Sequence, residues 1–156
     1  MSPLNSLRAA DTDARSINDP GNIVQTALSA LNDGRIAEAI ALFDDRFTFE
    51  DHALGLEITD KRLLAEYFER VKELTPDALV ELVSLGDSDD LVVAEWKLTA
   101  TQNVVYWRQL RMPIVVRGIS SILIENGKIT RWSDYYVGAR ARRASLAASF
   151  VDWVET

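Results

Sequence analysis

The chain of 156 residues fits one domain, and its hydrophobic fraction of 47% with a charged fraction of 26% is typical of a soluble globular protein. Its 17 basic and 24 acidic side chains give a net charge of −7, which disfavours nucleic-acid binding, and the absence of cysteine excludes disulfides and thiolate chemistry. No apolar run approaches membrane-spanning length, and residues 1–16 lack the apolar core of a signal peptide. We therefore expect a cytoplasmic protein that binds neither nucleic acid nor membrane.

The chain begins with a segment that has no apolar periodicity, so residues 1–18 are predicted to be a flexible arm and 19–156 a single domain. Asp19 and Pro20 favour a helix start, with Asp19 as the cap. Apolar residues then recur at helical spacing until the Asn-Asp-Gly sequence at 32–34 ends the helix.

Two further helices and one strand are predicted before residue 77. A short helix is expected over 36–43, ending at an acidic pair, and alternating residues predict a strand over 47–50. A loop through Gly55 leads to a third helix, which begins at Asp60 and ends near Pro76.

The second half changes to strand periodicity. Four strands are expected, at about 79–86, 91–103, 112–125 and 128–137. Asn126-Gly127 predicts a tight hairpin between the last two strands, and an apolar face predicts a terminal helix over 139–153. Helices followed by antiparallel strands indicate an α+β fold, in which a sheet curls around a helix and leaves a pocket.

Several segments in this order resemble the nuclear-transport-factor-two-like superfamily, and within it the SnoaL-like polyketide cyclases and the limonene-epoxide-hydrolase-like proteins. The matching segments are Leu31–Gly34, Asp44-Asp45, Phe47–Asp51, Gly118, Glu125–Ile129 and Trp132–Tyr136. The resemblance covers about 20–138. It implies a cone of N-terminal helices packed in a curved, mainly antiparallel sheet that encloses an apolar pocket, and a homodimer, as in many relatives.

Asp134 is the strongest catalytic candidate. Trp132, Asp134 and Tyr136 share one strand face, which by resemblance lines the pocket. The related cyclases have an acid–base aspartate where Asp134 stands, and the epoxide hydrolases have a relay carboxylate there. Burial would raise the pKa of this carboxyl toward neutrality. The alternative is that Asp134 only accepts hydrogen bonds from a neighbouring strand or an arginine.

Other candidates come from the first strand and from the strand connections. Asp51 matches the general base of ketosteroid isomerases, Phe49 shares its face, and His52 follows as a possible proton relay or ligand contact. Ser120 and Trp107 are candidate substrate-binding residues, Trp107 in a strand connection where large rings often form a pocket rim. For Trp96, core packing is the simpler interpretation.

The departures from the family patterns restrict the chemistry. Ala27 and Ser120 stand where the isomerases need a tyrosine and an aspartate, and 99–101 reads Thr-Ala-Thr where the hydrolases have Arg-x-Asp. The resemblance therefore favours a cofactor-independent cyclase or isomerase that acts by acid–base catalysis on a hydrophobic carbonyl compound, without metal. The alternatives are an epoxide hydrolase and a non-catalytic small-molecule binding protein.

Overall fold

The computed structural model describes residues 18–105 and 109–137. These ranges contain three helices and six strands: α1 (Pro20–Asn32), α2 (Ile36–Ala41), β1 (Phe43–Asp51), β2 (Leu56–Ile58), α3 (Lys61–Leu74), β3 (Leu79–Ser88), β4 (Leu91–Val105), β5 (Gln109–Glu125) and β6 (Lys128–Tyr136). The predicted arm, the terminal helix at 139–153 and Trp107 lie outside the described residues. None of the helices in the described ranges has the length and hydropathy needed to span a bilayer.

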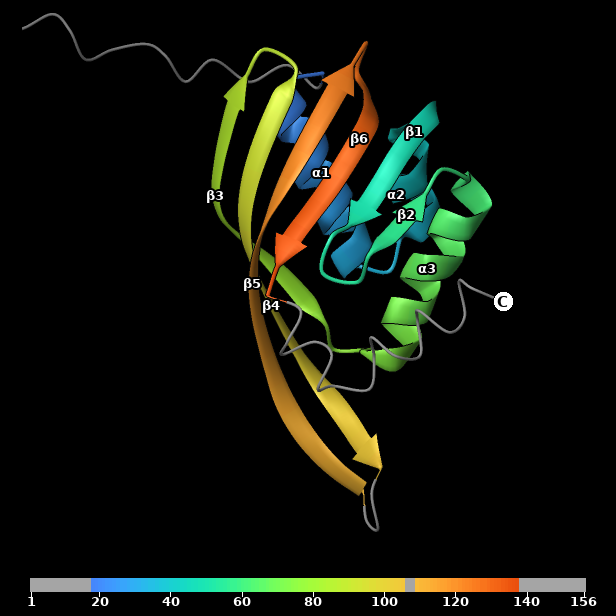
Figure 1. Ribbon diagram of the computed structural model, residues 1–156, viewed down its shortest axis with the longest axis vertical. Coiled ribbons are helices and arrows are strands. Elements are labelled where there is room, and N and C mark those ends of the chain that lie inside the picture. Colours follow the sequence, from blue (N-terminus) through green and yellow to red (C-terminus); the bar gives the residue numbers. More distant parts are fainter. Residues whose placement is uncertain (1–17, 106–108, 138–156) are drawn as a thin grey trace, which may run out of the picture.

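The strands form one curved sheet in the order β2-β1-β6-β5-β4-β3, and the helices pack on one face of it (Figure 1). The hairpins are antiparallel, and β1 runs parallel to β6. The α+β prediction with a mainly antiparallel sheet is confirmed. At the predicted turn between β5 and β6, Asn126 and Gly127 have φ values of 51° and 74°, the left-handed conformations that such a turn requires.

The helix ends follow the sequence signals in part. Asp60 caps α3, because its Oδ1 accepts a hydrogen bond of 3.0 Å from the Leu63 amide. Asp19 occupies the corresponding position before α1, but its side chain makes no capping bond, so this detail of the prediction was wrong. At its C-terminal end, α1 is bonded to β3. The Asn32 side chain donates one hydrogen bond to the Val80 carbonyl and accepts one from the Val80 amide, both of 2.8 Å.

The prediction of the second helix was wrong at its C-terminal end. The helix ends at Ala41, and Phe43 already pairs with Ile129 of β6. A register irregularity between Phe43 and Thr48 interrupts this pairing, which explains why strict alternation is visible only from Phe47 onward. The short strand β2 replaces part of the predicted loop.

A hydrophobic core fills the space between the helices and the inner face of the sheet. Its fully buried members come from every layer, among them Val24 of α1, Phe49 of β1, Leu64 of α3 and Ile122 of β5. The core is continuous with the walls of a cavity, so packing of the helices on the sheet also sets the shape of the candidate site.

Candidate functional site

The described residues line a partly open cavity of about 240 Å³ between the inner face of the sheet and helices α1 and α3. Most of its wall is apolar. Seven aromatic side chains contribute to the wall: Phe43, Phe49, Phe68, Tyr67, Tyr136, Trp96 and Trp132. A site of this kind suits a small hydrophobic ligand.

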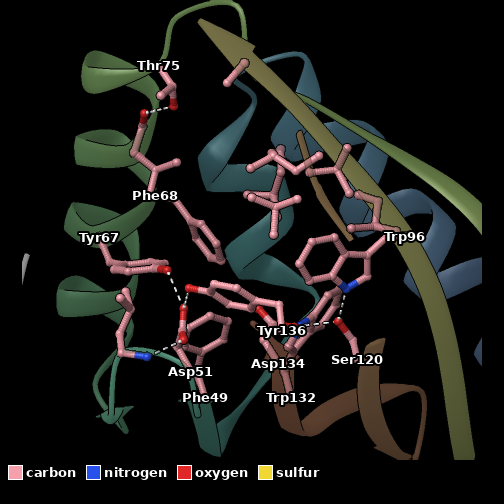
Figure 2. A pocket seen from close by; sticks show the side chains of 18 of the residues that line it. Phe49, Asp51, Tyr67, Phe68, Thr75, Trp96, Ser120, Trp132, Asp134 and Tyr136 are labelled. Atoms are coloured by element: carbon pink, nitrogen blue, oxygen red, sulfur yellow. Dashed lines mark hydrogen bonds between the residues drawn. The ribbon is translucent and has the colours of Figure 1, made fainter. Parts of the chain in front are cut away.

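Most of the polar groups of the cavity lie toward one end (Figure 2). Asp51 and Asp134 both line it, and they are directly paired neighbours on the parallel strands β1 and β6. At the opposite end in the view lies Thr75, whose hydroxyl donates to the Val71 carbonyl at 2.7 Å. The cavity therefore has an acidic end and an apolar body.

Asp134 receives two hydrogen bonds on one oxygen. Ser120 Oγ lies 2.5 Å from Asp134 Oδ1, and Trp132 Nε1 donates to the same oxygen at 2.7 Å. Burial raises the pKa of Asp134 to about 7, even though these two bonds stabilise the carboxylate and lower the pKa. A carboxyl with this pKa can both accept and return a proton near neutrality.

Asp51 is 2% exposed and is held by several donors. Its Oδ1 accepts a hydrogen bond from the Leu54 amide at 3.0 Å. Its Oδ2 accepts from Tyr136 Oη at 2.7 Å and from Tyr67 Oη at 3.4 Å. Burial raises the pKa of Asp51, against the lowering effect of these bonds. Burial also raises the pKa of both tyrosines, which keeps them protonated as donors.

His52 lies outside the cavity. Its side chain is 45% exposed, and its Nε2 is 3.3 Å from Glu50 Oε2. The ring stacks on Tyr135 with centroids 4.3 Å apart, on the outer face of the sheet. Because strand side chains alternate, Phe49 and Asp51 face inward while Glu50 faces outward, and His52 joins the outward set. The structure therefore does not bring His52 into contact with a ligand in the cavity.

The other candidates within the described residues do line the cavity: Phe49, Ser120, Trp132 and Tyr136. Trp96, for which core packing was the simpler interpretation, is 8% exposed and forms part of the wall. Tyr67 of α3 also lines the cavity and was not among the predicted site residues. The signal that could have found it is a tyrosine hydroxyl between the apolar residues of a helix. Of the two kinds of donor in the alternative interpretation of Asp134, the neighbouring strand supplies one, Ser120. The arginines of the two strands, Arg117 and Arg131, are exposed and do not bond to Asp134.

Comparisons with solved structures identify the fold. A candidate SnoaL-like polyketide cyclase from Jannaschia sp. matches with a TM-score of 0.71 at 13% identity, covering 87% of this chain and 96% of the other. A hypothetical protein with a ketosteroid isomerase-like fold from Catenulispora acidiphila, in complex with trimethylamine, matches with a TM-score of 0.69 at 20% identity, covering 79% and 91%. TerC co-crystallised with polyporic acid matches with a TM-score of 0.68 at 12% identity, covering 80% and 97%.

No curated protein matches the chain significantly. The family model of the SnoaL-like domain matches residues 24–132, which include all of β1 with Asp51 and the first part of β6, but not Asp134. The chain belongs to the SnoaL-like domain family, with the nuclear-transport-factor-two-like fold.

Proposed function

We propose that the protein is a cofactor-independent cyclase or isomerase that moves protons on a hydrophobic, carbonyl-containing small molecule. The observation that carries the proposal is Asp134, a carboxyl with a pKa of about 7 at the acidic end of an apolar cavity. A general base works best when its pKa is near the working pH, because both protonation states are then available. Membership of the SnoaL-like family and the small-molecule ligands of structural neighbours support the proposal.

The proposed reaction is an intramolecular aldol cyclisation. The Asp134 carboxylate takes a proton from the carbon beside one carbonyl group and leaves an enolate. The enolate carbon attacks a second carbonyl carbon of the same molecule, so one carbon–carbon bond forms and that carbonyl becomes an alkoxide. Asp134 then returns the proton to the alkoxide. Atoms and protons balance within the substrate and one carboxyl group, so the reaction needs no cofactor.

The apolar body of the cavity contributes by holding the substrate folded. Bringing the two reacting carbons of a flexible molecule together removes much of the entropic barrier to ring closure. Phe49, Phe68 and Trp96 present ring surfaces to this space. Asp51 is held by Tyr136 and Tyr67, and its role in the proposal is to shape the acidic end of the cavity.

The test is turnover by the wild type and by Asp134→Asn across a panel of aromatic ketones, polyketide mimics and epoxides. Asparagine is nearly isosteric with aspartate but cannot act as a base. We expect kcat to fall by about 10²- to 10⁴-fold while ligand binding, read by thermal shift, persists. Asp87→Asn, at an exposed aspartate of β3, is the matched control and should retain activity. Equal turnover by Asp134→Asn and the wild type would contradict the proposal.

An epoxide hydrolase is the second candidate, and the shared cavity of Asp51 and Asp134 favours it. Two carboxyl groups in one cavity suit the activation of water and the protonation of an epoxide oxygen. Residues 99–101 supply no arginine to bridge them, which favours the cyclase. Formation of a diol from the epoxides of the panel, with no reaction of the ketones, would support the hydrolase.

A non-catalytic binding protein would use the same cavity without proton transfer. Solvent deuterium exchange at the carbon beside the carbonyl of a bound ligand separates the two cases. Exchange that requires Asp134 supports the enzyme. Binding of the same ligand with no exchange supports a carrier or sensor.

A further inference from the structure

A chain of hydrogen bonds crosses three adjacent strands and ends at Asp134. Trp96 Nε1 of β4 donates to Ser120 Oγ of β5 at 2.8 Å, and Ser120 Oγ lies 2.5 Å from Asp134 Oδ1 of β6 (Figure 2). An indole N–H can only donate, so the oxygen of Ser120 is the acceptor in the first bond. The single hydroxyl proton of Ser120 is then directed to Asp134.

Gly118 makes this arrangement sterically possible. It lies directly opposite Trp96 in the β4–β5 ladder, two residues before Ser120. A Cβ atom at position 118 would lie 2.3 Å from Cζ2 of Trp96, which is far inside van der Waals contact. The indole therefore lies across the glycine, and from there its Nε1 reaches Ser120.

Both described donors to Asp134 reach the same oxygen. Ser120 and Trp132 donate to Oδ1, and one carboxylate oxygen accepts about two hydrogen bonds through its lone pairs. A further proton is therefore accepted at Oδ2. Ser120 is 1% exposed and Trp96 is 8% exposed, so water competes little for these bonds.

We propose that Ser120 and Trp96 are positioning residues, with Trp96 acting through Ser120, and that they make Oδ2 the oxygen of Asp134 that exchanges protons with a ligand. The catalytic consequence rests on the proposed function, whereas the orientation of the carboxyl group does not. The titratable described residues that interact with Asp134 are Asp51, His52, Tyr67 and Tyr136. None of the substitutions used in the tests below replaces any of these four residues.

The first test measures the pKa of the Asp134 carboxyl by ¹³C NMR on the full chain. Ser120→Ala removes a donor to the carboxylate, so the pKa should rise by about one unit. Trp96→Phe should shift it less, because Ser120 remains. In the Ser120→Ala background, Trp96→Phe should add no further shift. Ser121→Ala, whose side chain lies on the other face of β5, is the control and should leave the pKa unchanged.

The same variants give a distinct pH profile of activity. A rise of one unit lowers the ionised fraction of Asp134 at pH 7 from about one half to about one tenth, so kcat/KM there should fall about fivefold for Ser120→Ala. The deficit should shrink as the pH rises to 9, because Asp134 is then ionised in both proteins, and the deficit that remains measures the loss of carboxyl orientation. A merely structural defect would lower kcat/KM by the same factor at both pH values.

Two results would overturn the proposal. The first is an unchanged Asp134 pKa in Ser120→Ala. The second is a pKa shift from Trp96→Phe that is as large in the Ser120→Ala background as in the wild type, because Trp96 would then not act through Ser120. The expected pKa shifts together with no turnover by the wild type would support the orientation of Asp134 and contradict the proposed function. The two hypotheses are therefore tested separately.

Discussion

Tyr136 Oη donates a hydrogen bond of 2.7 Å to Asp51 Oδ2, and this bond joins the ends of the parallel strands β6 and β1. A buried carboxylate without donors is costly, and burial does raise the pKa of Asp51. The tyrosine offsets part of that cost. One bond thus links the stability of the domain to the geometry of the acidic end of its cavity.

Tyr136→Phe should destabilise the protein at pH 8 by about 1–2 kcal/mol. The variant keeps the ring, which packs edge-on against Trp96 with centroids 5.8 Å apart, and removes only the donor. The Asp51 carboxylate then loses its shortest hydrogen bond in a site that is 2% exposed. Urea unfolding measures the change in the free energy of unfolding.

The control is the neighbouring tyrosine on the other face of the strand. Tyr135 is 49% exposed and stacks on His52. Tyr135→Phe should change the free energy of unfolding by less than about 0.5 kcal/mol. Equal destabilisation by the two substitutions would show that the bond to Asp51 contributes nothing specific.

Local patterns in the sequence predict most of the fold. Long periodic segments such as α3 and β6 were predicted within a few residues, because each buries one continuous face. The three-residue strand β2 was missed, because so short a segment shows no period. The start of β1 at Phe43 was missed for another reason, since its pairing with Ile129 depends on a strand more than 80 residues away.

The site was less predictable than the fold. Alternation along β6 and the resemblance together brought Trp132, Asp134 and Tyr136 to one face, as the structure has them. The same alternation applied to β1 would have separated His52 from Asp51. The bond from Trp96 to Ser120 could not be predicted, because it depends on the register of β4 against β5 and on the missing side chain of Gly118.

Gly118→Ala should destabilise the protein by about 1–3 kcal/mol. The added methyl group would overlap the buried indole of Trp96, which must move away from Ser120. We expect a lower urea midpoint together with a changed tryptophan fluorescence spectrum. Gly86→Ala in β3 is the matched control, because its Cβ would meet no atom within 4 Å. If the two variants were equally stable, the close approach of Trp96 to Gly118 would be disproved.

Asp134 should make the stability of the protein fall as the pH rises from about 4 to about 8. Its pKa is about 7 in the folded state and about 4 in the unfolded chain, so between these values the folded state binds more protons. The free energy of unfolding then decreases with pH. This contribution is fully present below the unfolded pKa and is lost as the pH passes through 7. Its size is of the order of a few kcal/mol.

Asp134→Asn removes this contribution, which isolates it from all other titrating groups. Relative to the wild type, the variant should gain stability between pH 5 and pH 8, as measured by urea unfolding at each pH. Asp87→Asn, at an exposed position, should show no such pH-dependent difference. A difference between Asp134→Asn and wild type that is constant over this range would mean that Asp134 titrates below it.

The cavity should reject ligands with a negative charge at their polar end. Among the described residues its lining contains Asp51 and Asp134 but no lysine, arginine or histidine. An anion there would be buried beside two carboxyl groups with no cation to pair with. For two ligands that differ only by a methyl ester and its carboxylate, we expect the carboxylate to bind at least about tenfold more weakly near pH 8. Calorimetric titration measures both affinities.

The penalty should shrink near pH 6, because Asp134, with its pKa of about 7, is then mostly protonated and can donate to the ligand carboxylate. In Asp134→Asn the ratio of the two affinities should instead vary little between pH 6 and pH 8, since the titrating group is absent. That variant therefore separates the charge of Asp134 from that of Asp51, which stays in place. Equal binding of ester and carboxylate by the wild type near pH 8 would contradict this prediction. It would require a cation from another part of the chain at this end of the cavity, and the two aspartates would then no longer be a reason to expect neutral substrates.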